Sequence, residues 1–82
     1  MSRDGVVRSP SVGRVIEVLV RVGDAVGVGQ EVAVVESMKV EIPVAAAEGG
    51  QVATVLVVAG DPVRAGDVLL TLAGARNDKE GV

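Results

Sequence analysis

An internal repeat is the feature of this chain that most limits what it can fold into. When the sequence is laid on itself at an offset of 37, residues 13–36 face residues 50–73, and 9 of the 24 facing pairs are identical. Three glycine pairs and one aspartate pair are among them: Gly13/Gly50, Gly23/Gly60, Gly29/Gly66 and Asp24/Asp61. Repeats of this period usually build solenoids or propellers, which need at least three copies to bury a core. Two copies therefore predict one small domain with internal quasi-two-fold symmetry.

The abundance of valine predicts an all-β fold. Valine supplies 21 of the 82 residues, and β-branched side chains pack well on a pleated sheet but lose χ1 freedom in a helix. Short strands separated by regular Gly-Asp turns are typical of a small sandwich or flattened barrel. We expect strands over residues 5–9, 14–22, 32–36, 40–44, 51–58 and 68–72, with short extended pieces near Val26 and Val63.

Composition excludes several classes of function. The chain contains no cysteine, no histidine and no aromatic residue. Disulfides, cysteine or histidine metal sites and cysteine nucleophiles are therefore absent, and ordinary acid–base catalysis lacks its usual residue. A net charge of −3, with scattered arginines and no stacking residues, argues against nucleic acid as a partner. We expect a protein that has no catalytic residues of its own.

Domain organisation follows from where the repeat ends. Residues 1–73 form the predicted domain, and residues 74–82 form a polar, flexible tail that offers little to a core. No apolar stretch approaches the 18 or so residues of a membrane span, and the first residues lack the apolar segment of a secretory signal. We therefore expect no membrane partner and a cytoplasmic location.

Lys39 lies where the repeat predicts an exposed hairpin. Residues 32–36 and 40–44 are both strand-like, so the segment between them must turn tightly with Met38 and Lys39 at or near its tip. The usual Asn-Gly or Asp-Gly is missing, although such a tip requires positive φ. A locally unfavourable choice is expected where function overrides stability. The two-fold axis is expected to place this tip at the opposite end from residues 74–82.

Two groups of residues resemble a known family. They are Glu36-Ser37-Met38-Lys39 followed by Glu41-Ile42-Pro43, and the pairs Gly60-Asp61 and Gly66-Asp67. The pattern resembles the biotinyl domain of biotin-dependent carboxylases, especially the small biotin/lipoyl attachment proteins, over roughly residues 5–73. The resemblance implies a flattened barrel of two four-stranded antiparallel sheets. Val40 departs from the second methionine of the Met-Lys-Met motif of that family.

The resemblance also implies roles for the residues of the motif. Lys39 would carry biotin through an amide bond, and Met38 and Val40 would form the context that a biotin protein ligase recognises. A lesser part in this recognition falls to Glu36, Ser37 and Glu41. The modified domain would then carry a carboxyl group between a biotin carboxylase and a carboxyltransferase.

Other interpretations of these residues stay open. A lone lysine at a hairpin tip usually serves solubility, and Glu36 and Glu41 can simply keep a sheet edge from pairing with other chains. Lys79 in the tail is the chain's only other lysine. A lipoyl carrier of an acyl-transfer or dehydrogenase complex is the main alternative. Val40 favours it, whereas Met38 stands where lipoyl domains usually have aspartate. A third interpretation is an unmodified structural adaptor, which would usually need a helical hairpin that residues 37–49 have no room for.

Overall fold

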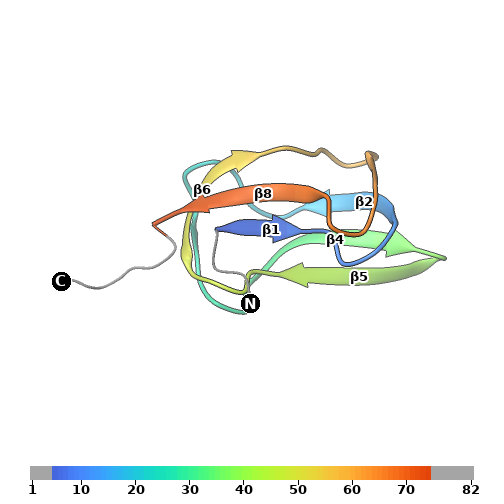
Figure 1. Ribbon diagram of the computed structural model, residues 1–82, viewed down its shortest axis with the longest axis horizontal. Coiled ribbons are helices and arrows are strands. Elements are labelled where there is room, and N and C mark those ends of the chain that lie inside the picture. The colour runs from blue at the N-terminus through green and yellow to red at the C-terminus, as the bar shows by residue number, and fades with distance from the viewer. Residues whose placement is uncertain (1–4, 75–82) are drawn as a thin grey trace.

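The computed structural model describes residues 5–74, which form an all-β fold of two stacked sheets (Figure 1). Its strands are β1 (Val6–Arg8), β2 (Gly13–Val18), β3 (Ala25–Val26), β4 (Glu31–Ser37), β5 (Val40–Ala45), β6 (Gly50–Val55), β7 (Pro62–Val63) and β8 (Val68–Ala73). One antiparallel sheet has the order β1-β8-β6-β3 and the other the order β5-β4-β2-β7. The predicted flattened barrel of two four-stranded antiparallel sheets is confirmed.

The quasi-two-fold symmetry is visible in the strand order. The offset of 37 carries β2, β3 and β4 onto β6, β7 and β8, and it carries β1 onto the end of β5. Applied to the sheet β1-β8-β6-β3, the same exchange gives β5-β4-β2-β7, which is the other sheet. Each sheet therefore contains strands from both halves, so neither half can bury its apolar face without the other.

Three turns of the barrel share the same hydrogen bond. In each of three turns an aspartate Oδ2 accepts the backbone N–H of the residue three positions earlier, which is local turn chemistry that aspartate favours. These bonds are Arg21 N to Asp24 at 2.9 Å, Val58 N to Asp61 at 2.9 Å, and Arg64 N to Asp67 at 2.8 Å. The Gly-Asp pairs thus act in turn formation.

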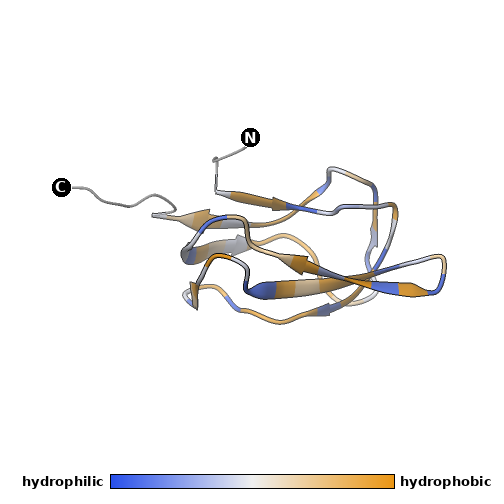
Figure 2. Cartoon of the chain, turned by 90° about the horizontal axis from the view of Figure 1, so that it is seen from below, coloured by the Kyte–Doolittle hydropathy of each residue, from blue (hydrophilic) through white to orange (hydrophobic). Residues whose placement is uncertain are grey.

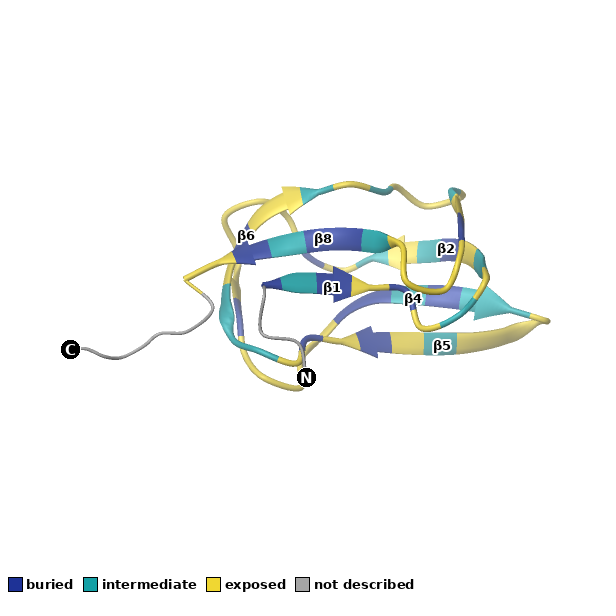
Figure 3. Ribbon diagram, in the orientation of Figure 1, coloured by how far each residue is buried: buried dark blue, intermediate teal, exposed yellow. Residues whose placement is uncertain are grey.

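The core consists of aliphatic side chains from the facing surfaces of the two sheets. Its largest fully buried members are Leu69, Leu70, Val15, Val32, Val35 and Val52. Figure 2 shows that the strands are mostly hydrophobic, with short hydrophilic stretches near strand ends and in the connections. The middle segments of β4 and β8 carry much of the buried surface, whereas the β4–β5 hairpin tip is exposed (Figure 3). The hairpin tip is therefore free to serve a purpose other than packing.

Two predicted strands were too long. The expected strands over residues 14–22 and 51–58 end at Val18 and Val55. The reason is topological, because β2 and the following β3 belong to different sheets, so the intervening chain must cross between layers. β6 and β7 are related in the same way. A register irregularity within β2 and another within β6 precede these exits. The remaining predicted boundaries agree with the structure to within one residue at nearly every strand end.

The β4–β5 hairpin and the C-terminal end of β8 lie at opposite ends of the long axis, as the symmetry predicted (Figure 1). Most of the predicted tail, residues 75–82, lies outside the described residues. Within residues 5–74, no helix is long and apolar enough to cross a membrane.

Candidate functional site

The β4–β5 hairpin turns through two residues only. Ser37 pairs with Val40, and Met38 and Lys39 form the loop between them. Met38 has φ of 52° and Lys39 has φ of 67°, so both lie in the left-handed region that favours glycine. Positive φ at both central residues is the pattern of a type I′ turn, whose twist matches that of the flanking strands. The expected tip, including its positive φ, is confirmed.

The side chains of the tip are displayed to solvent. Met38 is 92% exposed, Val40 is 60% exposed, and Lys39 is also exposed. Lys39 is the sole lysine among residues 5–74, since Lys79 falls outside them. An exposed methionine and valine beside a single primary amine give a recognisable apolar surface around one nucleophile.

Two carboxylates stand below the turn. Glu36 and Glu41 are directly opposite each other on β4 and β5. Like charges in this arrangement are unfavourable, by about 0.2–1 kcal/mol relative to a neutral pair. Lys39 is three residues from Glu36 and two from Glu41, so the tip carries a small cluster of charges of both signs. The structure therefore brings together Glu36, Ser37, Met38, Lys39, Val40 and Glu41 on one hairpin, as predicted.

Two contacts at the base of the hairpin had not been predicted. The Ser11 hydroxyl, in the loop between β1 and β2, donates to the Ser37 hydroxyl at 3.1 Å. Gly13 lies against the backbone of Glu36, where an added Cβ would collide with the Glu36 carbonyl oxygen. Both residues belong to Ser9-Pro10-Ser11-Val12-Gly13, the segment that leads into the first repeat, but sequence position alone does not indicate that they face the hairpin.

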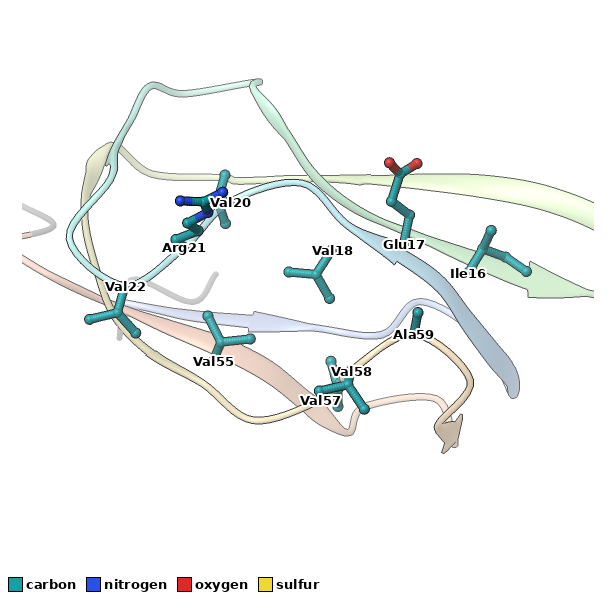
Figure 4. Close-up of a pocket in the computed structure, with 10 residues that line it drawn as sticks. All are labelled: Ile16, Glu17, Val18, Val20, Arg21, Val22, Val55, Val57, Val58 and Ala59. Carbon is teal, nitrogen blue, oxygen red and sulfur yellow. The ribbon is translucent and has the colours of Figure 1, made fainter.

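A hollow in the surface lies away from the hairpin tip. It is an apolar groove of about 460 Å³, lined by the ends of β2 and β6 and by the segments that follow them (Figure 4). Valines line both sides, with Val18 and Val20 facing Val55 and Val57. None of the predicted site residues lines it. The offset of 37 relates Val18 to Val55 and Val20 to Val57, so equivalent residues of the two halves line the groove. The groove is distinct from the lysine tip.

The chemistry available to the tip is that of an amine. Among residues 5–74, no group of three or more histidine, cysteine, aspartate or glutamate side chains could hold a metal ion. A lysine offers a primary amine on a flexible four-carbon stem, which can be acylated by an activated carboxylic acid. The geometry fits covalent attachment of a group that must extend away from the protein.

Comparison with known proteins agrees with this chemistry. The family model described as "Biotin-requiring enzyme" matches residues 5–72. The biotinylated protein TB7.3 homolog of Mycobacterium leprae is 43% identical over 67 residues, which cover 82% of this chain and 94% of that protein. The biotin/lipoyl attachment protein of Bacillus subtilis is 48% identical over 63 residues, covering 77% of this chain and 86% of that protein.

Solved structures agree as well. Kluyveromyces lactis urea carboxylase is similar with a TM-score of 0.78 and 35% identity, over 83% of this chain but only 6% of that one. The lipoyl domain of the 2-oxoglutarate dehydrogenase complex from Azotobacter vinelandii is similar with a TM-score of 0.65 and 28% identity, over 77% of this chain and 80% of that one. By sequence, fold and the geometry of its lysine tip, this chain belongs to the family of biotin/lipoyl attachment domains, which are carrier modules.

Proposed function

We propose that this protein is a biotin carboxyl carrier that is biotinylated on Lys39. The observation that carries the proposal is the tip itself, where the sole lysine of residues 5–74 is exposed on a two-residue turn with positive φ at both positions. Attached biotin supplies a ureido nitrogen that can accept and release a carboxyl group. The chain's own part is to provide the amine and to hold it clear of the barrel.

The attachment step uses the Lys39 side chain as a nucleophile. Its uncharged amine attacks the carbonyl carbon of biotinyl adenylate, the mixed anhydride of biotin and AMP that a biotin protein ligase delivers, and AMP is the activating group. An amide bond forms, the activating group leaves, and the amine gives up one proton. The lysine charge is removed, and the resulting neutral arm is easier to place inside a partner's site than a charged one.

The neighbours of Lys39 give the ligase something to recognise. Met38 and Val40 flank the amine with exposed apolar surface, and exposed apolar side chains in one place mark interaction sites. Glu36 and Glu41 face each other, and the repulsion between their carboxylates lowers the stability of the hairpin. Basic groups of a partner would relieve that repulsion. We assign Met38 and Val40 the main part in recognition, and Glu36, Ser37 and Glu41 a supporting part.

Transfer between enzymes follows from tethering. The partners that the chemistry requires are a biotin carboxylase, which loads the arm, and a carboxyltransferase, which unloads it. A tethered group searches for both sites at an effective concentration on the order of millimolar, so it need not be released between them. Among the similar structures, the part of urea carboxylase that matches this domain is 6% of that much longer chain.

A lipoyl carrier is the second candidate. Val40 replaces the second methionine of the biotin motif, and a lipoyl domain is among the similar structures. Met38, which stands where lipoyl domains usually have aspartate, favours biotin. The two candidates differ in the acid attached to Lys39 and in the ligase that attaches it.

Mass spectrometry of the purified protein, after incubation with a biotin ligase or a lipoate ligase, tests both candidates. We expect one biotin per chain, located on Lys39 by peptide mapping, and Lys79 unmodified. Lys39→Arg is the matched control, since it keeps the charge and length but cannot form the amide. Biotin on the Lys39→Arg protein would refute the assignment of the residue, and much faster lipoylation than biotinylation would favour the second candidate.

Two substitutions at the tip test what selects the cofactor. Met38→Asp should lower biotinylation and raise lipoylation, whereas Val40→Met should keep or improve biotinylation. Both side chains are exposed, so neither change should disturb the core. Far-UV circular dichroism checks that the barrel is intact. Equal rates for Met38→Asp and the unaltered protein with both ligases would show that this residue does not select the cofactor.

A further inference from the structure

A chain of three serines connects the hairpin tip to the body of the barrel. The buried Ser9 is held by the turn before β8, because its N–H donates to the Asp67 carbonyl at 2.8 Å and its carbonyl accepts from Gly66 at 2.8 Å. The Ser9 hydroxyl donates to the Ser11 carbonyl at 2.7 Å. Ser11 in turn donates to the Ser37 hydroxyl at 3.1 Å. Through these bonds a fixed turn of the barrel reaches the residue two positions before Lys39.

The hairpin needs such a connection because its tip extends beyond the sheet. β2 supports β4 only as far as the pair Arg14 and Glu36. Beyond that pair, the last rung of the hairpin, Ser37 with Val40, belongs to no backbone ladder of residues 5–74 other than that of β4 and β5. β5 is an edge strand, so no further strand steadies it from the other side. The Ser11 hydroxyl is thus the contact that continues support along β4 toward the turn.

The symmetry shows that this arrangement is confined to the lysine end. The offset of 37 places Ala46, Glu48 and Gly74 at the positions that correspond to Ser9, Ser11 and Ser37. None of the three carries a hydroxyl group, since Ala46 and Gly74 have no polar side-chain atom and Glu48 has a carboxyl group. One backbone hydrogen bond of this region nonetheless has an equivalent at the other end, because Gly66 N to Ser9 O and Gly29 N to Ala46 O are both 2.8 Å long. That backbone bond therefore forms without a serine at the equivalent position, and hydroxyl groups at these three positions are found only at the lysine end.

We propose that Ser11 and Ser37 are positioning residues, a clasp between hydroxyl groups that holds the β4–β5 turn in the orientation in which a ligase acylates Lys39. This inference rests on the proposed function, since it concerns the attachment reaction. Met38 and Lys39 occupy a backbone region that non-glycine residues rarely adopt, and such conformations persist only when the surroundings determine them. The clasp helps to hold the turn in this conformation through a contact from outside the hairpin.

Ligation kinetics of Ser11→Ala, Ser37→Ala and the double variant test the clasp. Each single change should lower kcat/KM for the ligase about fivefold, the scale of one lost hydrogen bond. The double variant should be no slower than either single one, because both remove the same bond. Ser37→Thr keeps the hydroxyl group, so its kcat/KM should stay close to that of the unaltered protein.

Thr71→Ala is the matched control. Thr54 and Thr71 form another hydroxyl–hydroxyl bond, of 2.7 Å, on the other sheet. Its loss should leave ligation unchanged.

Two further measurements separate positioning from accessibility and from the proposed function itself. A small acylating reagent, acetic anhydride, should modify Lys39 at the same rate in all variants, because the amine stays exposed. Backbone ¹⁵N relaxation should show greater mobility at residues 38 and 39 in both single variants, whether or not a cofactor is attached.

The outcomes distinguish the two ideas. Ligation of the serine variants at the unaltered rate, in a protein that is biotinylated on Lys39, would overturn the clasp and leave the proposed function intact. If neither ligase modifies the unaltered protein, the proposed function fails, and unchanged relaxation in the variants would then refute the clasp as well.

Discussion

Replacing Gly13 with alanine tests the close approach of β2 to β4 at the base of the hairpin. A Cβ atom on residue 13 would fall well inside 3.0 Å of the Glu36 carbonyl oxygen, a distance that real Cβ atoms essentially never reach. It would also lie 3.0 Å from the Glu36 carbonyl carbon and 3.3 Å from Cγ1 of Val35. β4 lies inside its sheet, so its backbone cannot move aside without disturbing β5 as well. Rotation of a side chain cannot relieve this clash.

The expected loss of stability is set by two opposing effects. Overpacking costs about 1–3 kcal/mol, and a clash with backbone atoms belongs at the upper end of that range. Alanine also restricts the unfolded chain, which offsets roughly 0.4–1 kcal/mol of the loss. A net loss of about 2 kcal/mol should lower Tm by about 10 °C, because each 1 kcal/mol shifts Tm by about 4–8 °C in a domain of this size.

Thermal unfolding followed by far-UV circular dichroism measures this loss, and Gly27→Ala is the control. A Cβ on residue 27 would meet nothing within 4 Å, and residue 27 is not among the glycines with positive φ. Its Tm should therefore stay the same or rise slightly. If Gly13→Ala melted within about 2 °C of the unaltered protein, the strands could separate more easily than the structure indicates, and the reasoning would be wrong.

Three further predictions concern the turns, the tip and the tail. Asp24→Ala and Asp61→Ala remove equivalent turn bonds and should each cost about 1 kcal/mol, and clearly unequal Tm values would contradict the symmetry of the turns. Met38→Asn should raise Tm by a few degrees, because asparagine tolerates positive φ and the exposed methionine side chain makes few contacts. A lower Tm would show that Met38 supports the fold. Deletion of residues 75–82 should leave Tm and ligation nearly unchanged, because the family match ends at residue 72, and a loss of about 5 °C would show that they stabilise the barrel.

Much of the fold could be predicted because the repeat and the valine pattern act locally. The glycine and aspartate pairs marked the turns, and the two strand-like segments around Lys39 left room only for a tight hairpin. Positive φ at its tip followed from the length of that loop. The strand ends at Val18 and Val55 could not be predicted, since they depend on which sheet receives the next strand. The run of apolar residues continues past both strand ends without a change in pattern, so it does not show where the chain leaves one sheet for the other.

The site was predicted only where its residues are neighbours in sequence. Glu36 through Glu41 lie on one hairpin, and the register that sets the two glutamates opposite each other follows from a two-residue turn. The contact between Ser11 and Ser37 joins residues 26 apart, and it depends on how the loop before β2 passes the end of β4. Local pattern carries no information about such a contact. Comparison of the two repeat ends could have indicated it, because hydroxyl groups occur at the lysine end and are missing from all three equivalent positions.

The stability of the barrel gives a reason to regard the hairpin tip as selected for function. Left-handed conformations of non-glycine residues cost about 1 kcal/mol or more each, and Met38 and Lys39 both adopt one. Facing glutamates add a smaller unfavourable contribution below them. A domain of 82 residues has a total stability of only about 4–12 kcal/mol, so the tip uses a large fraction of it. Asparagine and glycine would form the same turn at lower cost, yet glycine at position 39 would remove the amine. A single exposed amine at the tip is what Lys39 provides and what glycine at that position would lack.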